Sequence, residues 1–155
     1  SYIKSEISKS NAILGGEMSG HIFYNDNWYG FDDGIFAALK LLEILSSKES
    51  TTHEVFNKFT QLFNTPEIKI AVEDDEKFEI VEQLKVKLKP EGYNSILIDG
   101  LRLENKDCWG LVRASNTTPS LILRFEANTE QKLMEIQELF QKTLLEISTN
   151  LKFLN

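Results

Sequence analysis

The break at Asn64-Thr65-Pro66 constrains this chain more than any other feature of its sequence. Pro66 lacks a backbone N–H and biases Thr65 toward extended torsions, so a helix that reaches this point must end. Residues 1–63 have the pattern of an α/β protein, whereas residues 67–155 have that of an α+β domain. The sequence therefore predicts two domains, at 1–63 and 67–155, joined by a hinge or linker at 64–66.

The first part is expected to consist of short helices around one brief strand. A polar helix at 2–10 precedes a buried strand at 12–14, and Gly15-Gly16 would end that strand in a turn. Asp32-Asp33 opens a strong apolar helix, for which either carboxylate can serve as the N-cap. A second helix is predicted from His53 to Phe63, with one apolar face formed by Val55, Phe56, Phe59 and Phe63.

The second part is expected to form a small antiparallel sheet with helices on one face. Residues 68–72 alternate as a half-buried strand does, and the final helix starts near Asn128-Thr129. The Asp99-Gly100 pair predicts a tight hairpin turn. Four short strands are predicted at Ser95–Ile98, Leu101–Leu103, Trp109–Val112 and Leu121–Phe125. The two helices are predicted to bury Phe78, Val81, Leu84 and Leu88 in the first and Leu133, Ile136, Phe140, Leu144 and Ile147 in the last.

Charge and composition exclude several classes of protein. Lys and Arg number 17 against 24 Asp and Glu, a net charge of −7, which disfavours binding to nucleic acid or anionic membranes. The single Cys108, with only two His, excludes an intramolecular disulfide and the usual zinc sites, and no metal site is expected. No signal peptide or membrane span is visible, so a soluble cytoplasmic protein is expected. A start at Ser1 in place of Met suggests that the sequence begins inside a longer chain.

The segment Gly15–His21 gathers three glycines, a carboxylate, a hydroxyl and an imidazole after the first strand. Glu17 and Ser19 are two residues apart, so in an extended chain they point the same way and could bind adjacent hydroxyls of a sugar. The alternative is a glycine-rich surface turn with a solvated Glu17. For His21 taken alone, a structural or exposed role is more common than a catalytic one.

The segment Arg113–Pro119 is the second unusual loop. The chain has 14 Lys and three Arg, yet Arg113 and Arg124 bracket this loop. Arg presents a planar fork that matches phosphate oxygens, which Lys cannot reproduce. Ser115, Asn116 and Thr117 add side-chain donors and could aim successive backbone N–H groups inward as an anion nest. The alternative is a hairpin loop with an incidental Arg.

Together these motifs resemble the bacterial phosphomannomutase/phosphoglucomutase family of α-D-phosphohexomutases. Family enzymes have four domains, and this sequence is similar to the second half of the third and the whole of the fourth. The fold expected is therefore an α/β half-domain followed by a small α+β domain. The resemblance is carried by Gly-Glu-Met-Ser-Gly-His at 16–21, Trp-Tyr-Gly-Phe-Asp-Asp-Gly at 28–34, Thr-Pro-Glu-Ile at 65–68, Trp-Gly-Leu-Val-Arg-Ala-Ser-Asn-Thr-Thr-Pro at 109–119 and Leu-Arg-Phe-Glu-Ala at 123–127.

The resemblance implies an isomerase that interconverts hexose 1-phosphates and 6-phosphates of mannose, glucose or both. In the family, a phosphoserine of the first domain donates its phosphoryl group to the sugar, and the bisphosphorylated sugar reorients and returns the other phosphoryl group. Mg²⁺ and a hexose 1,6-bisphosphate activator are the cofactors expected in the full-length phosphoprotein. The hexose phosphate substrate and the N-terminal domains of the same chain are the partners expected, in a cytoplasmic monomer.

The resemblance also assigns roles to individual residues. Glu17 and Ser19 match positions that contact the 3- and 4-hydroxyls of the sugar, and His21 matches a residue near proton transfer. The remaining matched binding residues are Met18 and Gly20 in the first loop and Arg113, Ala114, Ser115, Asn116 and Thr117 in the loop that holds the non-reacting phosphate.

The departures from the family pattern are also informative. Neither the nucleophile loop nor the metal loop of the family occurs in this sequence, so the fragment alone is expected to be inactive and to bind no cofactor. Phosphoglucosamine mutase is an alternative, although Met18 and Asn116 favour the mannose and glucose enzymes. A non-catalytic phosphosugar-binding module is the other alternative.

Overall fold

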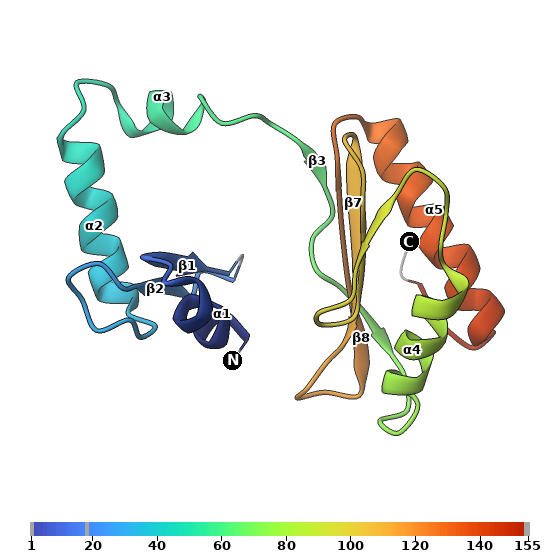
Figure 1. The fold of residues 1–155 in the computed structure, drawn as a ribbon. Coiled ribbons are helices and arrows are strands. Elements are labelled where there is room, and N and C mark those ends of the chain that lie inside the picture. Colours follow the sequence, from blue (N-terminus) through green and yellow to red (C-terminus); the bar gives the residue numbers. More distant parts are fainter. Residues whose placement is uncertain (1, 18, 154–155) are drawn as a thin grey trace. The chain divides into compact units, whose positions relative to one another are not determined.

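The protein is described by a computed structural model that covers residues 2–17 and 19–153. The chain divides into two compact units, Ser1–Thr60 (unit 1) and Gln61–Asn155 (unit 2). Figure 1 shows the elements of both units. The succession of an α/β part and an α+β part is confirmed.

Unit 1 contains three helices and one hairpin. The helices are α1 (Tyr2–Ser10), α2 (Gly34–Ser46) and α3 (Thr52–Phe56), and the strands β1 (Leu14–Gly16) and β2 (Ile22–Tyr24) pair antiparallel. The helix expected at 2–10 is confirmed. The strand expected at 12–14 is wrong in its position and burial, because β1 starts at Leu14 and the side chains of Ile13 and Leu14 are mostly exposed. Three consecutive apolar residues indicate a strand, but they do not determine whether other parts of the protein pack against that strand and bury it.

Gly15 and Gly16 lie inside β1, so the prediction that they form the turn is also wrong. Gly15 has a packing role instead. A Cβ atom at Gly15 would lie 2.7 Å from Cδ1 of Ile7, so the glycine lets α1 approach the strand closely. The turn glycine is Gly20, which has a φ of +88°, a torsion that residues with a side chain rarely adopt.

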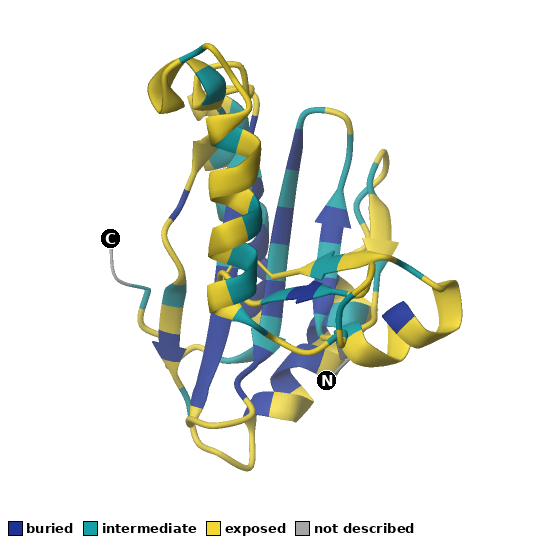
Figure 2. Ribbon diagram, turned by 90° about the vertical axis from the view of Figure 1, so that its left-hand side faces the viewer, coloured by how far each residue is buried: buried dark blue, intermediate teal, exposed yellow. Residues whose placement is uncertain are grey.

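The helix α2 begins as predicted, with Asp33 as its N-cap. An Asp33 carboxylate oxygen accepts a hydrogen bond from the N–H of Phe36 at 2.9 Å, and the Phe36 ring stacks on Trp28 with 4.0 Å between centroids. No residue of α2 is buried (Figure 2). Among the described residues of unit 1, only Ile7 and Phe23 are buried apolar side chains. This unit therefore has a small core and an exposed apolar helix.

The helix predicted from His53 to Phe63 is wrong in length. The helix α3 ends at Phe56, while Phe63 lies in β3 (Phe63–Asn64), where it pairs with Ala127 of β8 (Ser120–Ala127). Apolar spacing every three to four residues suggested one helical face, but pairing with a strand far along the chain determines the structure after residue 60.

Unit 2 is a six-stranded antiparallel sheet with two helices on one face (Figure 1). The strands follow the order β3-β8-β7-β6-β5, and β4 also pairs with β8. Three of the four predicted short strands are longer than expected, and β3 was not predicted. The strand expected at 95–98 ends at Ile96, so the tight hairpin expected at Asp99-Gly100 is wrong and a longer loop joins β5 to β6. Besides β3 and β8 the elements are β4 (Ile68–Ala71), α4 (Lys77–Lys87), β5 (Asn94–Ile96), β6 (Leu101–Glu104), β7 (Cys108–Ala114) and α5 (Glu130–Ile147).

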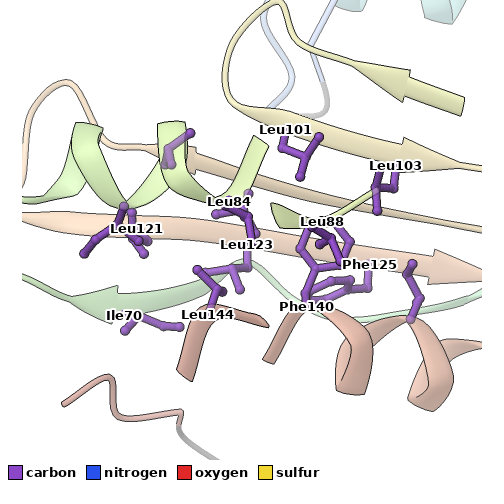
Figure 3. Packing of buried hydrophobic residues seen from close by; sticks show 14 of the residues in the cluster. Ile70, Leu84, Leu88, Leu101, Leu103, Leu121, Leu123, Phe125, Phe140 and Leu144 are labelled. Atoms are coloured by element: carbon purple, nitrogen blue, oxygen red, sulfur yellow. The ribbon is translucent and has the colours of Figure 1, made fainter. Parts of the chain in front are cut away.

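The core of unit 2 lies between the sheet and the helices α4 and α5 (Figure 3). Alternate residues of β7 point into it, and Gly110 lies so close to the rings of Phe125 and Phe140 that a Cβ atom would be 2.7 Å from both. Phe78 was expected in this core but is exposed, and Ile80 takes the inward position. The fully buried side chains include Ile70, Leu84, Leu101, Leu103, Leu121, Leu123, Ile136, Phe140 and Leu144.

The segment predicted as a hinge, 64–66, is hydrogen bonded to β8. Asn64 pairs with Glu126, the Thr65 N–H donates to the Phe125 carbonyl at 3.0 Å, and the Phe125 N–H donates to Thr65 Oγ1 at 3.1 Å. Thr65 is buried. A hinge motion within 64–66 would have to break these hydrogen bonds. The hinge predicted at 64–66 is not tested by the structure and stays a prediction.

Candidate functional site

Glu17 and Ser19 are brought together by a tight turn. The Glu17 N–H donates to the His21 carbonyl and the Gly20 N–H donates to the Glu17 carbonyl, each at 2.9 Å. The chain is therefore not extended here, as the sequence argument assumed. Ser19 Oγ nevertheless donates to Glu17 Oε2 at 3.3 Å. The two side chains form one polar pair at the tip of the β1–β2 hairpin, and the prediction on Met18 lies outside the described residues.

This polar tip, the 17–21 turn, is open to solvent. Glu17, Ser19, Gly20 and His21 are all exposed. Because the Ser19 proton is donated to Glu17, the remaining lone pairs of the carboxylate and of the Ser19 oxygen can accept hydrogen bonds from neighbouring donors. That is the chemistry needed to bind adjacent hydroxyl groups, and it requires no rearrangement of the turn.

His21 has a partner that the sequence argument missed. Its Nδ1 lies 2.6 Å from Oδ2 of Asp32. The backbone of Asp32 forms an isolated antiparallel β-bridge with Phe23, which lies in β2 two residues after His21. A carboxylate only accepts hydrogen bonds, so Nδ1 carries the proton and Nε2 is the atom left for another partner.

The two adjacent aspartates therefore have different roles. Asp33 caps α2 and also accepts a hydrogen bond from Trp28 Nε1 at 3.3 Å, whereas Asp32 orients His21. The sequence contained no signal of the Asp32–His21 pair, because a second aspartate at a helix start can equally well remain in solvent.

The loop at 113–119 is held together by the hydroxyl of Ser115. Ser115 Oγ accepts hydrogen bonds from the N–H groups of Thr117 at 3.3 Å and Thr118 at 3.1 Å, and from Thr118 Oγ1 at 2.8 Å. Thr118 Oγ1 in turn lies 2.8 Å from Ser120 Oγ. In these three hydrogen bonds the Ser115 oxygen is the acceptor, so the hydroxyl proton of Ser115 is still free to be donated to another partner.

Two of the N–H groups that an anion nest in this loop could use are already occupied. These are the N–H groups of Thr117 and Thr118, which are bonded to Ser115. The loop also lacks the αR–αL form of a nest, because the described non-glycine residues with positive φ are Asn11 and Asn27, outside this loop. Any anion bound here would therefore rely on side chains, chiefly Arg113, with Asn116 and Thr117 exposed beside it.

All three arginines of the chain lie on the face of the sheet opposite α4 and α5. In the antiparallel register, Leu111 lies between Arg102 and Arg124, and Arg113 lies opposite Ile122. Arg113 and Arg124 are thus diagonal neighbours, roughly 7–8 Å apart between Cα atoms. Arg102 is paired with Glu104 at 2.9 Å and lies over the Trp109 ring. In the described part of the chain, Arg113 and Arg124 make no ion pair, so two cations beside the loop lack a carboxylate partner.

The backbone of Arg113 is packed against the β5–β6 turn. Gly100 has a φ of +97°, and a Cβ atom there would lie 2.2 Å from the Val112 carbonyl oxygen and 2.8 Å from Cα of Arg113. The loop that joins β5 to β6, through Gly100, therefore also supports the start of the 113–119 loop.

The described residues form neither a metal-binding cluster nor a membrane-spanning helix. Between residues 2 and 17 and between 19 and 153, no group of three or more His, Cys, Asp or Glu side chains is placed to hold a metal ion. None of the helices described is both long enough and apolar enough to cross a membrane.

Known proteins match most of this chain. Residues 1–63 match the family model "Phosphoglucomutase/phosphomannomutase, alpha/beta/alpha domain III", and residues 67–142 match "Phosphoglucomutase/phosphomannomutase, C-terminal domain". A phosphomannomutase/phosphoglucomutase of Pseudomonas aeruginosa is 46% identical over 97% of this chain. A phosphoglucomutase of Neisseria meningitidis serogroup A is 47% identical over 97%. The crystal structure of a phosphoglucomutase/phosphomannomutase family protein from Burkholderia thailandensis has a TM-score of 0.86 and 36% identity over 97% of this chain.

The chain belongs to the phosphoglucomutase/phosphomannomutase family and corresponds to domains III and IV of that family. It spans 33% of the length of the two relatives and 32% of the Burkholderia protein. The resemblance inferred from the motifs is confirmed.

Proposed function

We propose that this chain is the sugar- and phosphate-recognising segment of a phosphohexomutase that interconverts the 1-phosphates and 6-phosphates of mannose and glucose. One observation carries the proposal. Arg113 has no carboxylate partner among the described residues and stands beside Ser115, whose remaining hydrogen-bonding capacity is a proton to donate. Such a pair suits a phosphate dianion, and family membership supplies the reaction class.

The 113–119 loop would hold the phosphate that does not react. The guanidinium of Arg113 would donate two parallel hydrogen bonds to phosphate oxygens, and the Ser115 hydroxyl would donate a third. The side chains of Asn116 and Thr117, with the backbone at Ala114, complete the proposed contacts. Binding energy from this remote group would position the reacting end of the sugar.

The 17–21 turn would bind hydroxyl groups of the sugar. The Glu17 carboxylate would accept hydrogen bonds from two adjacent hydroxyls, and the Ser19 oxygen, whose own proton is donated to Glu17, would accept from one of them. Contacts to hydroxyls that mannose and glucose share would admit both epimers. His21, with Nδ1 hydrogen bonded to Asp32, would exchange a proton through Nε2.

The groups that transfer phosphoryl would come from other parts of a longer protein. In the family these are a phosphoserine and a Mg²⁺ site, and a hexose 1,6-bisphosphate serves as activator. The described residues offer no ligand set for Mg²⁺, so we assign no step of the reaction to a metal held by this chain. We therefore propose that the chain alone is inactive, and that the longer protein acts as a cytoplasmic monomer.

A chimaera tests the proposal. This chain would replace the matching third of the Pseudomonas aeruginosa relative, and turnover of mannose 1-phosphate, glucose 1-phosphate and glucosamine 1-phosphate would be measured. We expect turnover of the first two, and none by the unfused chain. Glu17→Gln should impair both epimers alike, with Glu6→Gln on α1 as the control. Turnover of the glucosamine substrate alone would favour a phosphoglucosamine mutase, and a folded chimaera without any turnover would favour a non-catalytic phosphosugar-binding module.

A further inference from the structure

Lys77, the first residue of α4, is the only buried basic side chain in the described part of the chain. Its side chain is 5% exposed, whereas that of its ion-pair partner Asp74 is 73% exposed. Burying an ammonium group is costly unless hydrogen bonds compensate for the lost water. The position of Lys77 therefore calls for an explanation beyond the stability of one helix turn.

The partners of Lys77 connect α4 with the 113–119 loop. Nζ lies 2.6 Å from Asp74 Oδ1, and it donates to the backbone carbonyl of Thr118 at 3.3 Å. Asp74 is three residues away in sequence, but Thr118 is 41 residues away. The second bond is thus a tertiary contact between the start of a helix and the back of the loop.

A neighbouring backbone bond reinforces this contact. The Val72 N–H donates to the Pro119 carbonyl at 3.1 Å, so Val72, just after β4, and Lys77, at the start of α4, hold two successive carbonyls of the loop. The N–H of Thr118 is bonded to Ser115 Oγ. Its carbonyl accepts two hydrogen bonds, one from the Ser120 N–H within the loop at 2.9 Å and one from Lys77 Nζ at 3.3 Å. Because Thr118 is held from both sides, a shift at Lys77 would reach Ser115 through a single residue.

We propose that Lys77 is a positioning residue for phosphate binding by the 113–119 loop. Its hydrogen bond to Thr118 keeps the Ser115 hydroxyl in place, and its charge lies behind a loop that receives an anion. This inference rests on the proposed phosphate-binding function of the loop. It differs from a purely stabilising role, because it requires a change in anion affinity in protein that is still folded.

The test is an inorganic phosphate titration of the 155-residue chain, followed by ¹⁵N–¹H NMR at the amides of Asn116, Thr117 and Thr118. Lys77→Met removes the charge and the donor while keeping the apolar stem. Lys85→Met is the matched control, because Lys85 lies on the same helix and pairs with Glu82, also at 2.6 Å and also three residues away. Thermal melting of each variant confirms folding at the titration temperature.

We expect Lys77→Met to weaken phosphate binding about fivefold or more, because the loss of one ordinary hydrogen bond corresponds to about that factor. The affinity of Lys85→Met should match that of the wild type. Lys77→Arg, which keeps charge and donors, should recover part of the affinity. If Lys77→Met fails to fold, Lys77→Gln replaces it, with weaker binding again expected. Wild-type affinity in a folded Met or Gln variant would overturn this inference alone. If the wild-type loop amides do not respond to phosphate, the proposed function of the loop is overturned as well.

Discussion

Replacing Gly100 with alanine should destabilise unit 2 far more than the same change at Gly92. Both glycines have positive φ, +97° and +80°, so an alanine at either position pays roughly 1–2 kcal/mol for a left-handed backbone. At Gly92 nothing lies within 4 Å of the new Cβ, and the penalty ends there.

At Gly100 the new Cβ would meet two backbone atoms. The Val112 carbonyl oxygen would lie at 2.2 Å and the Cα atom of Arg113 at 2.8 Å, and neither can rotate away as a side chain could. Moving the two strands apart should add about 1–3 kcal/mol, as overpacking of a core does. Gly100→Ala should therefore cost about 2–5 kcal/mol, against about 1–2 kcal/mol for Gly92→Ala.

Thermal melting followed by the fluorescence of Trp109 measures the difference. Trp28→Phe is used as the background, so that the signal reports on unit 2 alone. In a domain of this size, each kcal/mol lowers the Tm by about 4–8 °C, so Gly100→Ala should melt at least about 4 °C below Gly92→Ala. Equal melting temperatures would refute the claim that the β5–β6 turn is packed tightly against the start of the 113–119 loop.

Three further predictions follow from the geometry. In the active chimaera, Asp32→Asn should lower kcat by about tenfold or more with little change in KM, because His21 would lose its charged partner and positioned proton transfer contributes roughly 10²- to 10⁴-fold to the rate. An unchanged kcat would exclude the His21–Asp32 pair from the reaction. The 155-residue chain should melt in two steps, with unit 1 unfolding first, because the described core of unit 1 consists only of Ile7 and Phe23. A single melting transition followed by circular dichroism would contradict this. Burial and the hydrogen bond to Cys108 raise the pKa of Tyr93 to about 12, so unit 2 should lose stability as the pH rises from about 10 to 12. An ultraviolet titration in which Tyr93 ionises together with the exposed Tyr29 would show that this is wrong.

Local sequence signals predicted the elements that depend on neighbouring residues. The start of α2 at Asp33 and the start of α5 after Thr129 follow from side chains that cap nearby N–H groups. The position of the β5–β6 turn was predicted at Asp99-Gly100, but the tight two-residue hairpin is wrong, because β5 ends at Ile96 and Gly100, not Asp99, has a positive φ. The family itself was predictable, because each of the two unusual loops is a continuous stretch of sequence that can be compared directly with the family's motifs.

Contacts between distant segments were not predictable from local signals. Phe63 continues a helical pattern, yet it pairs with Ala127 in the sheet. Asp32 looks like a second cap, yet it binds His21 across a turn. Lys77 looks like a solvated residue after an acidic run, yet it reaches the Thr118 carbonyl. Each of these side chains acts on a residue that no periodicity or spacing connects to it.

The central claim is that the 113–119 loop holds a phosphate through the fork of Arg113. The most direct measurement is the steady-state kinetics of Arg113→Lys in the chimaera, with hexose 1-phosphate and hexose 6-phosphate as substrates in turn. Arg102→Lys is the control, because Arg102 lies on the same face of the sheet but is already paired with Glu104. Loss of one charge-assisted contact should lower kcat/KM about 10- to 100-fold in both directions, with an unchanged melting temperature and little effect of Arg102→Lys. Near-normal kcat/KM in a normally folded Arg113→Lys enzyme would contradict the account.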